Sequence, residues 1–190
     1  MSILETIQNR ASTPFVQDRP VPEDLIKKLL DAAVCTPVHY KSNPWRFVVI
    51  RGAARERFGE FMAERARKAM AEPDSAENKA KLEKLKSKPL RAPLIIVAAA
   101  IKPALDKVVM KENVASVAVA CQNILLCARE LGLGGIWRTG SLTYDTDTVD
   151  FLGLDEGSEL LGFLYLGYPE KSCPPKKREK ADGYTSWMDT

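Results

Sequence analysis

The chain has 190 residues, of which 45% are hydrophobic and 28% are charged, and this composition excludes an intrinsically disordered protein. The formal net charge of +3 is too small to indicate nucleic-acid binding, and the first ten residues lack the basic and then apolar order of a secretory signal. We therefore expect one globular, cytoplasmic domain over residues 1–190, with neither a membrane nor a nucleic acid as a partner.

The first half of the chain is predicted to contain four helices and one strand. Residues 2–9 place apolar side chains on one side of a short helix, and segment 21–35 is strongly amphipathic. The run RFVVI then predicts a strand at 46–51. Segments 53–72 and 75–88 carry many pairs of opposite charge at helical spacing, which is typical of helices on a surface.

The second half contains the segments from which we expect the core. The continuous apolar run at 92–101 predicts a strand buried on both faces. Residues 112–131 predict an Ala- and Val-rich central helix, whose apolar part is too short to span a membrane. A strand after the glycines of 132–135, a short helix at 146–152 and a strand at 160–167 follow. This irregular alternation predicts an α+β sandwich, with a central mixed sheet flanked by helices.

The cysteines indicate neither disulfides nor a metal site. Cys35, Cys121, Cys127 and Cys173 form no Cys-x-x-Cys pair, so we expect free thiols in a reducing compartment. With one histidine in the sequence, no metal site is predicted. Cys35 and His39 are four residues apart, but nothing indicates the third, orienting group that a Cys–His nucleophile requires.

The stretch NRAS, residues 9–12, is the first of three that carry chemistry beyond the needs of a core. An arginine beside a serine hydroxyl and free backbone N–H groups is suited to bind phosphate. The alternative is that Arg10 caps the end of its own helix. Short basic clusters are common, so this stretch alone favours the capping role.

The second stretch, CTPVHYKSNPW at 35–45, holds the only histidine of the sequence and leads into the strand at 46–51. A lone histidine in a loop is usually exposed to solvent, although its ordinary pKa of about 6.5 permits a role as a switch. From these residues alone, His39 has no assigned role.

The third stretch, LGLGGIWRTG at 131–140, has three closely spaced glycines, which permit the close approach of a flat or bulky group. Trp137 and Arg138 are suited to stack on, and hydrogen-bond to, an aromatic ring system. The stretch is not a dinucleotide fingerprint, because it follows a helix and leads into a strand. The alternative is a helix C-cap followed by a strand with a buried tryptophan.

Taken together and in this order, the stretches resemble the FMN-dependent nitroreductase family, in particular its short bacterial branch of NAD(P)H nitroreductases. The resemblance covers essentially the whole chain. Its motifs here are IQNRAS, PVPEDLIKKLLDAA, the histidine followed by PWRFVVI, RAPLII, GLGGIWRTGSLT and GFLYLGYP. The glycine–tryptophan–arginine motif with GFLYLG behind it is specific, whereas the amino-terminal motif alone is weak.

The resemblance implies a nitroreductase-like α/β sandwich in an interlocked homodimer, with two FMN molecules at the interface. It also implies an FMN-dependent oxidoreductase that takes electrons from NADH or NADPH. The acceptors would be nitroaromatics, quinones or similar electron-poor molecules, reduced in a ping-pong cycle through flavin N5. No catalytic side chain is then required, because FMN carries the chemistry.

By position, the resemblance also implies the residues that contact FMN, namely Arg10, Ala11, Ser12, His39, Trp137, Arg138 and Thr139. The first three would hold the phosphate and ribityl chain, and His39 would reach the flavin from the partner subunit. The last three would line the flavin on its other side. Arg138 is expected near flavin N1 and O2, where a positive charge would stabilise the reduced flavin.

Three positions depart from the pattern of this branch. Ala11 replaces a second arginine, Cys35 stands where arginine is often found, and Asn43 replaces a longer glutamine. Lys176 and Arg178 in the tail are candidates to supply the missing charge, although a solvated basic tail is the favoured interpretation.

These departures motivate an alternative function, a flavin-binding or flavin-sequestering protein without significant turnover. A small scaffold or nucleic-acid-binding protein is a further alternative. It is disfavoured because the charged helices mix both signs and no platform of aromatic and basic residues is evident.

Overall fold

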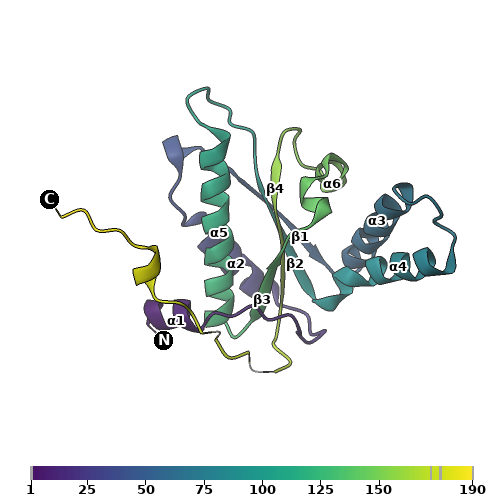
Figure 1. Cartoon of the computed structure of the whole chain (residues 1–190), viewed down its shortest axis with the longest axis horizontal. Coiled ribbons are helices and arrows are strands. Elements are labelled where there is room, and N and C mark those ends of the chain that lie inside the picture. Colours follow the sequence, from purple (N-terminus) through teal and green to yellow (C-terminus); the bar gives the residue numbers. More distant parts are fainter. Residues whose placement is uncertain (1, 172, 176, 190) are drawn as a thin grey trace.

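The computed structural model of the chain describes residues 2–171, 173–175 and 177–189. A four-stranded sheet lies at its centre, with the strand order β1-β2-β4-β3 (Figure 1). In that order, the strands are Trp45–Arg51, Leu94–Ala100, Glu159–Gly167 and Gly134–Arg138. β2 is buried at every position, as its continuous apolar sequence predicts.

All three strand pairs of this sheet are antiparallel, whereas the sequence pattern predicted a mixed sheet. Helix α5 (Met110–Glu130) joins β2 to β3, and these two strands do run in the same direction. They are not neighbours, because β4 lies between them and pairs antiparallel with both. Within the described residues, parallel pairing is confined to one isolated bridge between Ser12 and Gly135. The predicted α+β class is confirmed.

Helices cover both faces of the sheet. On one face, α2 (Glu23–Val34) and α5 pack against each other and against alternate side chains of β2, such as Ile96. On the other face, Phe58 of α3 (Ala54–Lys68) belongs to a second apolar cluster with Ile95. The period-2 alternation of β2 thus places apolar side chains in two cores, which is why its sequence is apolar throughout.

α3 and α4 (Ala76–Ser87) form a hairpin that projects to one side of the sheet (Figure 1). Gly59 permits their close contact, because a Cβ at this position would overlap the backbone carbonyl of Lys86. The short helix η2 (Lys88–Arg91) then returns the chain to β2. After β3, the helix α6 (Thr146–Phe151) packs on the α3 side of the sheet.

Both ends of the chain leave apolar side chains in solvent. α1 (Ile3–Asn9) begins with a capping box, yet none of its residues is buried, and the side chain of Ile3 is 81% exposed. The tail passes near α1 and leads away from the sheet (Figure 1), with Trp187 82% exposed. In the described part of the chain, no helix combines the length and apolar composition needed to cross a membrane.

Candidate functional site

β3 is an outer strand of the sheet, and its first half is covered by the segment that precedes α2. There, the backbone N–H of Thr13 donates to the carbonyl of Gly135 at 3.0 Å. Further along, Ile136 to Arg138 are half-buried, and Thr139 is exposed. The uncovered half of an outer strand offers backbone N–H and C=O groups to a ligand.

Two arginines lie at the covered end of β3, and the charge of a third, Arg178, acts on one of them. Arg10 and Arg129 line a small hollow of about 50 Å³ together with Ala11 and the start of β3. Burial, and then the nearby charge of Arg178, lowers the pKa of Arg10. Within the described residues, no carboxylate makes an ion pair with any of the three. Converging guanidinium groups without a carboxylate partner are suited to bind an anion such as phosphate.

The contacts of Arg10 argue against the capping role that its sequence favoured. Arg10 occupies the C-cap position of α1, but its guanidinium donates no hydrogen bond to α1 among the described contacts. Asn9 takes that role, because its amide donates to the carbonyl of Glu5 at 2.8 Å. Ser12 is exposed and lies in the bridge to β3. Lys176, the other tail candidate, lies outside the described residues.

The closely spaced glycines and the indole of Trp137 serve packing within the chain. Gly132, with φ of +73°, follows α5 as the C-cap alternative predicts. A Cβ on Gly134 would lie 2.6 Å from Cγ2 of Thr13. The indole N–H of Trp137 donates to the carbonyl of Leu161 at 2.8 Å, and the ring packs on the α5 side of the sheet. A ligand can therefore contact only the backbone of Trp137 and the exposed part of its ring.

Beyond the uncovered end of β3 lies a cavity of about 710 Å³, on the sheet face that α3 covers. Phe58, Phe163 and Tyr165 are among its walls, and its volume suits a drug-sized molecule, for which pockets are about 300–1,000 Å³. Arg138 also lines it, with its guanidinium 5.7 Å from the ring centre of Tyr165. The predicted residue Arg138 is thus near a space that can hold a planar ligand.

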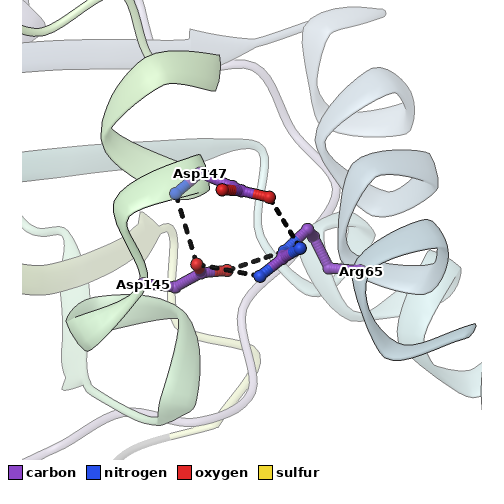
Figure 2. Close-up of polar contacts among 3 residues, drawn as sticks. All are labelled: Arg65, Asp145 and Asp147. Atoms are coloured by element: carbon purple, nitrogen blue, oxygen red, sulfur yellow. Dashed lines mark hydrogen bonds and ion pairs between the residues drawn. The ribbon is translucent and has the colours of Figure 1, made fainter. Parts of the chain in front are cut away.

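Two charged residues that line this cavity, Arg65 and Asp145, form a network with Asp147. Figure 2 shows the polar contacts among the three. Arg65 of α3 donates two hydrogen bonds to Asp145, from Nε to Oδ2 at 2.8 Å and from Nη2 to Oδ1 at 3.0 Å. Its Nη1 lies 2.6 Å from Oδ2 of Asp147. Asp145 also caps α6 by accepting from the backbone N–H of Asp147. The network ties the α3–α4 hairpin to the segment that follows β3.

The loop that holds His39 has an unusual backbone. Tyr40, Lys41 and Asn43 have φ angles of 48°, 55° and 44°, in the left-handed region that residues other than glycine adopt infrequently. Such conformations persist where the surrounding contacts enforce them, and they cluster at functional sites. The backbone conformation therefore supports a functional role for this loop, which the sequence alone did not assign.

Two residues of the first turns of α5 hold this loop. The ring nitrogen Nδ1 of His39 lies 3.2 Å from Oε1 of Glu112, which orients the ring and leaves Nε2 for another partner. The buried amide of Asn113 accepts from the hydroxyl of Ser42 at 3.3 Å and donates to the carbonyl of Ile101 at 3.0 Å. No local sequence signal pointed to either role, because both contacts join the loop to a helix about 70 residues away.

The structure brings Arg10, Ala11 and Ser12 together with β3, but it places His39 far from them. His39 contacts Glu112 near the start of α5, whereas Arg10 and Arg129 share a hollow near its end. These α5 residues are 17 positions apart, or about 25 Å at a rise of ~1.5 Å per residue. Within one chain, His39 and the arginine cluster therefore belong to separate regions.

The thiols of the chain show no arrangement for catalysis. Sγ of Cys35 donates to the carbonyl of Asp31 at 3.2 Å, one turn earlier in α2, and is not paired with His39. Burial raises the pKa of Cys121 to about 12, which keeps it a neutral thiol. Across the described ranges, no group of three or more His, Cys, Asp or Glu side chains is placed to hold a metal ion.

Comparisons with known proteins agree on one family. A sequence model of the nitroreductase family matches residues 7–168. The Escherichia coli K12 protein named "Putative NAD(P)H nitroreductase YdjA" is 34% identical over 170 residues, which cover 90% of each chain. Among solved structures, a nitroreductase-like family protein from Bacillus cereus has a TM-score of 0.85 at 26% identity, and covers 100% of this chain and 97% of its own. A nitroreductase with bound FMN from Desulfitobacterium hafniense DCB-2 has a TM-score of 0.70 at 20% identity, with 100% of both chains covered.

Proposed function

Because the chain belongs to the nitroreductase family, we propose that it binds FMN and uses NADH or NADPH to reduce nitroaromatics, quinones or similar electron-poor acceptors. The observation that carries this proposal is the arrangement along β3. An arginine cluster lies at the start of the strand, uncovered backbone at its end, and a cavity beside that end. This order fits a phosphate joined by a flexible chain to a planar ring.

At the start of β3, Arg10 binds the FMN phosphate, with Arg129 and Arg178 adding positive charge. Ala11 contributes backbone, and Ser12 its hydroxyl, toward the phosphate and the ribityl chain. Arg129 and Arg178 also account for the departure at Ala11, because they provide cations where a second arginine is missing. This favours an enzyme that retains FMN over a chain whose cofactor site has lost its charge.

At the end of β3, the backbone of Trp137 and Thr139 and the guanidinium of Arg138 contact the flavin ring. When bound, FMN supplies the redox chemistry, accepting a hydride from reduced nicotinamide at N5 and passing two electrons to the acceptor. The protein binds and orients the two substrates beside the cofactor, and the cavity walls shield the site from water.

His39 serves the site of a second copy of this chain, because about 25 Å of α5 separates it from Arg10. The exposed apolar residues of α1 and of the tail, including Ile3 and Trp187, are suited to the interface of a homodimer. Asn43 fits its place in this loop, since asparagine adopts a left-handed backbone more readily than most residues. This backbone conformation explains why asparagine stands at position 43 in place of the longer glutamine.

We expect His39→Ala to weaken FMN binding by about 3–10-fold, the value of one hydrogen bond of roughly 0.5–1.5 kcal/mol. The pH profile of turnover should stay as in the wild type, because His39 positions the cofactor and does not transfer a proton. FMN dissociation measured by fluorescence, beside a pH profile of kcat/KM, checks both parts. The variant His39→Gln, which keeps a donor, should recover part of the affinity. A changed profile with unchanged FMN affinity would contradict the positioning role.

We expect Arg138→Ala to lower the two-electron potential of bound FMN by about 30–60 mV. The reason is that a nearby cation favours the reduced, more negatively charged cofactor, and a charge-assisted contact contributes about 1.5–3 kcal/mol. Equilibration with a redox dye measures the potential directly. The variant Arg138→Lys keeps the positive charge, so its flavin potential should stay close to that of the wild type. An unchanged potential in Arg138→Ala would remove this role.

One experiment separates the proposed function from its alternatives. The purified protein should be yellow, NADH or NADPH should bleach the flavin absorbance, and a nitro compound or quinone should restore it. A flavin-sequestering protein would bind FMN but would not complete this cycle. Colourless protein that fails to bind added FMN would contradict both functions.

A further inference from the structure

The cavity beside β3 has an unusual balance of charge. Four cations line it: Arg65 from α3, Lys88 and Arg91 from η2, and Arg138 from β3. The lining residues include one carboxylate, that of Asp145. A cavity with aromatic walls and an excess of one charge focuses its electric field and attracts ligands of opposite charge.

The single carboxylate is already used by Arg65. Asp145 accepts two hydrogen bonds from the guanidinium, and Asp147 adds a second ion pair (Figure 2). The hydrogen bonds between the two side chains raise the pKa of Arg65 and lower that of Asp145, so both stay ionised near neutral pH. Arg65 is therefore a structural cation, and its charge is not available to a ligand.

The other three cations have no such compensation. Lys88, Arg91 and Arg138 make no ion pair with a carboxylate, and their side chains donate no hydrogen bond, within the residues that the structure describes. Lys88 and Arg91 both come from η2, on the side of the cavity formed by the hairpin. Two unpaired cations on one short helix are placed to bind one anionic group.

Tyr165 connects these cations to the aromatic wall. Tyr165, Arg91 and Arg138 all line the same cavity. Burial raises the pKa of Tyr165, while the charges of Arg138 and Arg91 act in the opposite direction. The ring of Tyr165 also lies under Arg138 at 5.7 Å. An anion near Arg91 would thus find a hydroxyl donor and an aromatic surface in the same space.

We propose that the cavity is selective for electron-poor aromatic acceptors that carry a carboxylate, with Lys88 and Arg91 binding the carboxylate and Tyr165 contacting the ring. This inference rests on the proposed function, because it names the acceptor class of the same site. Arg138 remains for the flavin, and the FMN phosphate is met by Arg10 and its neighbours. Lys88 and Arg91 are then specificity-determining residues of the acceptor site.

The test compares 4-nitrobenzoate with 4-nitrobenzamide, which has nearly the same shape but no charge. The wild type should reduce 4-nitrobenzoate with a kcat/KM about 10–100-fold higher than that of 4-nitrobenzamide. Arg91→Gln should remove most of this preference by raising KM for 4-nitrobenzoate, and should leave 4-nitrobenzamide within about twofold of the wild type. Lys88→Gln should act in the same direction, which keeps the test valid if one variant folds poorly.

The matched control is Arg57→Gln, which removes one arginine from the exposed surface of α3, outside the cavity lining. The kcat/KM values of Arg57→Gln for both substrates should equal those of the wild type. Equal kcat/KM values for the two substrates in the wild type, or an equal loss for both in Arg91→Gln, would overturn the inference.

A binding measurement with benzoate separates this inference from the proposed function. Benzoate cannot be reduced by the cycle, so calorimetric titration of the purified protein reports binding without turnover, and the part of that binding lost in Arg91→Gln reports the carboxylate site. Binding that is lost in Arg91→Gln, without turnover of any nitro compound, would support the carboxylate site and contradict the reductase function. Turnover of 4-nitrobenzamide with no benzoate binding would do the reverse, overturning the site and leaving the function in place.

Discussion

Arg10→Gln should weaken the binding of FMN by about 10–100-fold, the largest loss that we expect from any single side chain of the cofactor site. A hydrogen bond from a charged donor to a phosphate contributes roughly 1.5–3 kcal/mol. The guanidinium of Arg10 is partly buried and lies near Arg178, so it carries an unfavourable charge interaction that an anion would relieve. Its removal should therefore lower the affinity for the phosphate and leave the fold intact.

Riboflavin provides the matched ligand for this experiment, because it has the same ring and ribityl chain as FMN but no phosphate. Quenching of flavin fluorescence gives both dissociation constants for the wild type and for Arg10→Gln. We expect the wild type to prefer FMN strongly and the variant to lose that preference while binding riboflavin as before. Arg178→Gln should give a smaller loss of the same kind, since Arg178 is exposed. Equal losses for the two ligands would place the phosphate elsewhere.

Local sequence pattern predicted the elements of the fold well, and the pairing of its strands less well. The apolar run at 92–101 became β2, and the Ala- and Val-rich segment at 112–131 became α5, with ends moved by two residues or fewer. The insertion of β4 between β2 and β3 has no local signal, because it depends on contacts between distant segments. The predicted mixed sheet was wrong for that reason.

The arginine cluster likewise depends on contacts between distant segments, which local sequence patterns do not reveal. Arg10 was found from its own motif, because an arginine beside a serine is a local pattern. Arg129 lies near the end of a buried helix and carries no such mark, and it joins Arg10 only through the packing of α5 against β3. For Arg178, the sequence favoured a solvated tail; the residue is exposed, and its charge contributes to the lowered pKa of Arg10.

The sequence left two roles open for the indole of Trp137, a cofactor contact and a buried structural side chain, for a related reason. Its partner, the carbonyl of Leu161, is free to accept because the register between β2 and β4 shifts at this point. The shift leaves Leu161 without a partner in the β2 ladder, between Leu160 and Gly162. A sequence pattern does not reveal where a strand carries an extra residue, so it did not separate a cofactor contact from a structural hydrogen bond.

Gly162 is the residue on which this arrangement depends. Its φ is +131°, which favours glycine, and a Cβ there would lie 2.5 Å from the carbonyl oxygen of Arg138 and 2.7 Å from Nε1 of Trp137. Neither atom can move away easily, since the first belongs to the backbone of β3 and the second is hydrogen-bonded to Leu161. An alanine at this position would therefore push β3 away from β4 at the residues proposed to contact the flavin.

We expect Gly162→Ala to lower the free energy of unfolding by about 2–5 kcal/mol, which combines the strain of the backbone with the overlap of the added methyl group. Urea denaturation at one fixed protein concentration measures this loss, because the stability of the proposed homodimer would depend on concentration. Gly183→Ala is the control, since nothing lies within 4 Å of its Cβ position, and it should change stability by less than about 0.5 kcal/mol. The altered environment of Trp137 should also shift tryptophan fluorescence in Gly162→Ala and not in Gly183→Ala. Equal stability of the two variants would show that β3 has room at Gly162 and that the position of Trp137 and Arg138 does not depend on this contact.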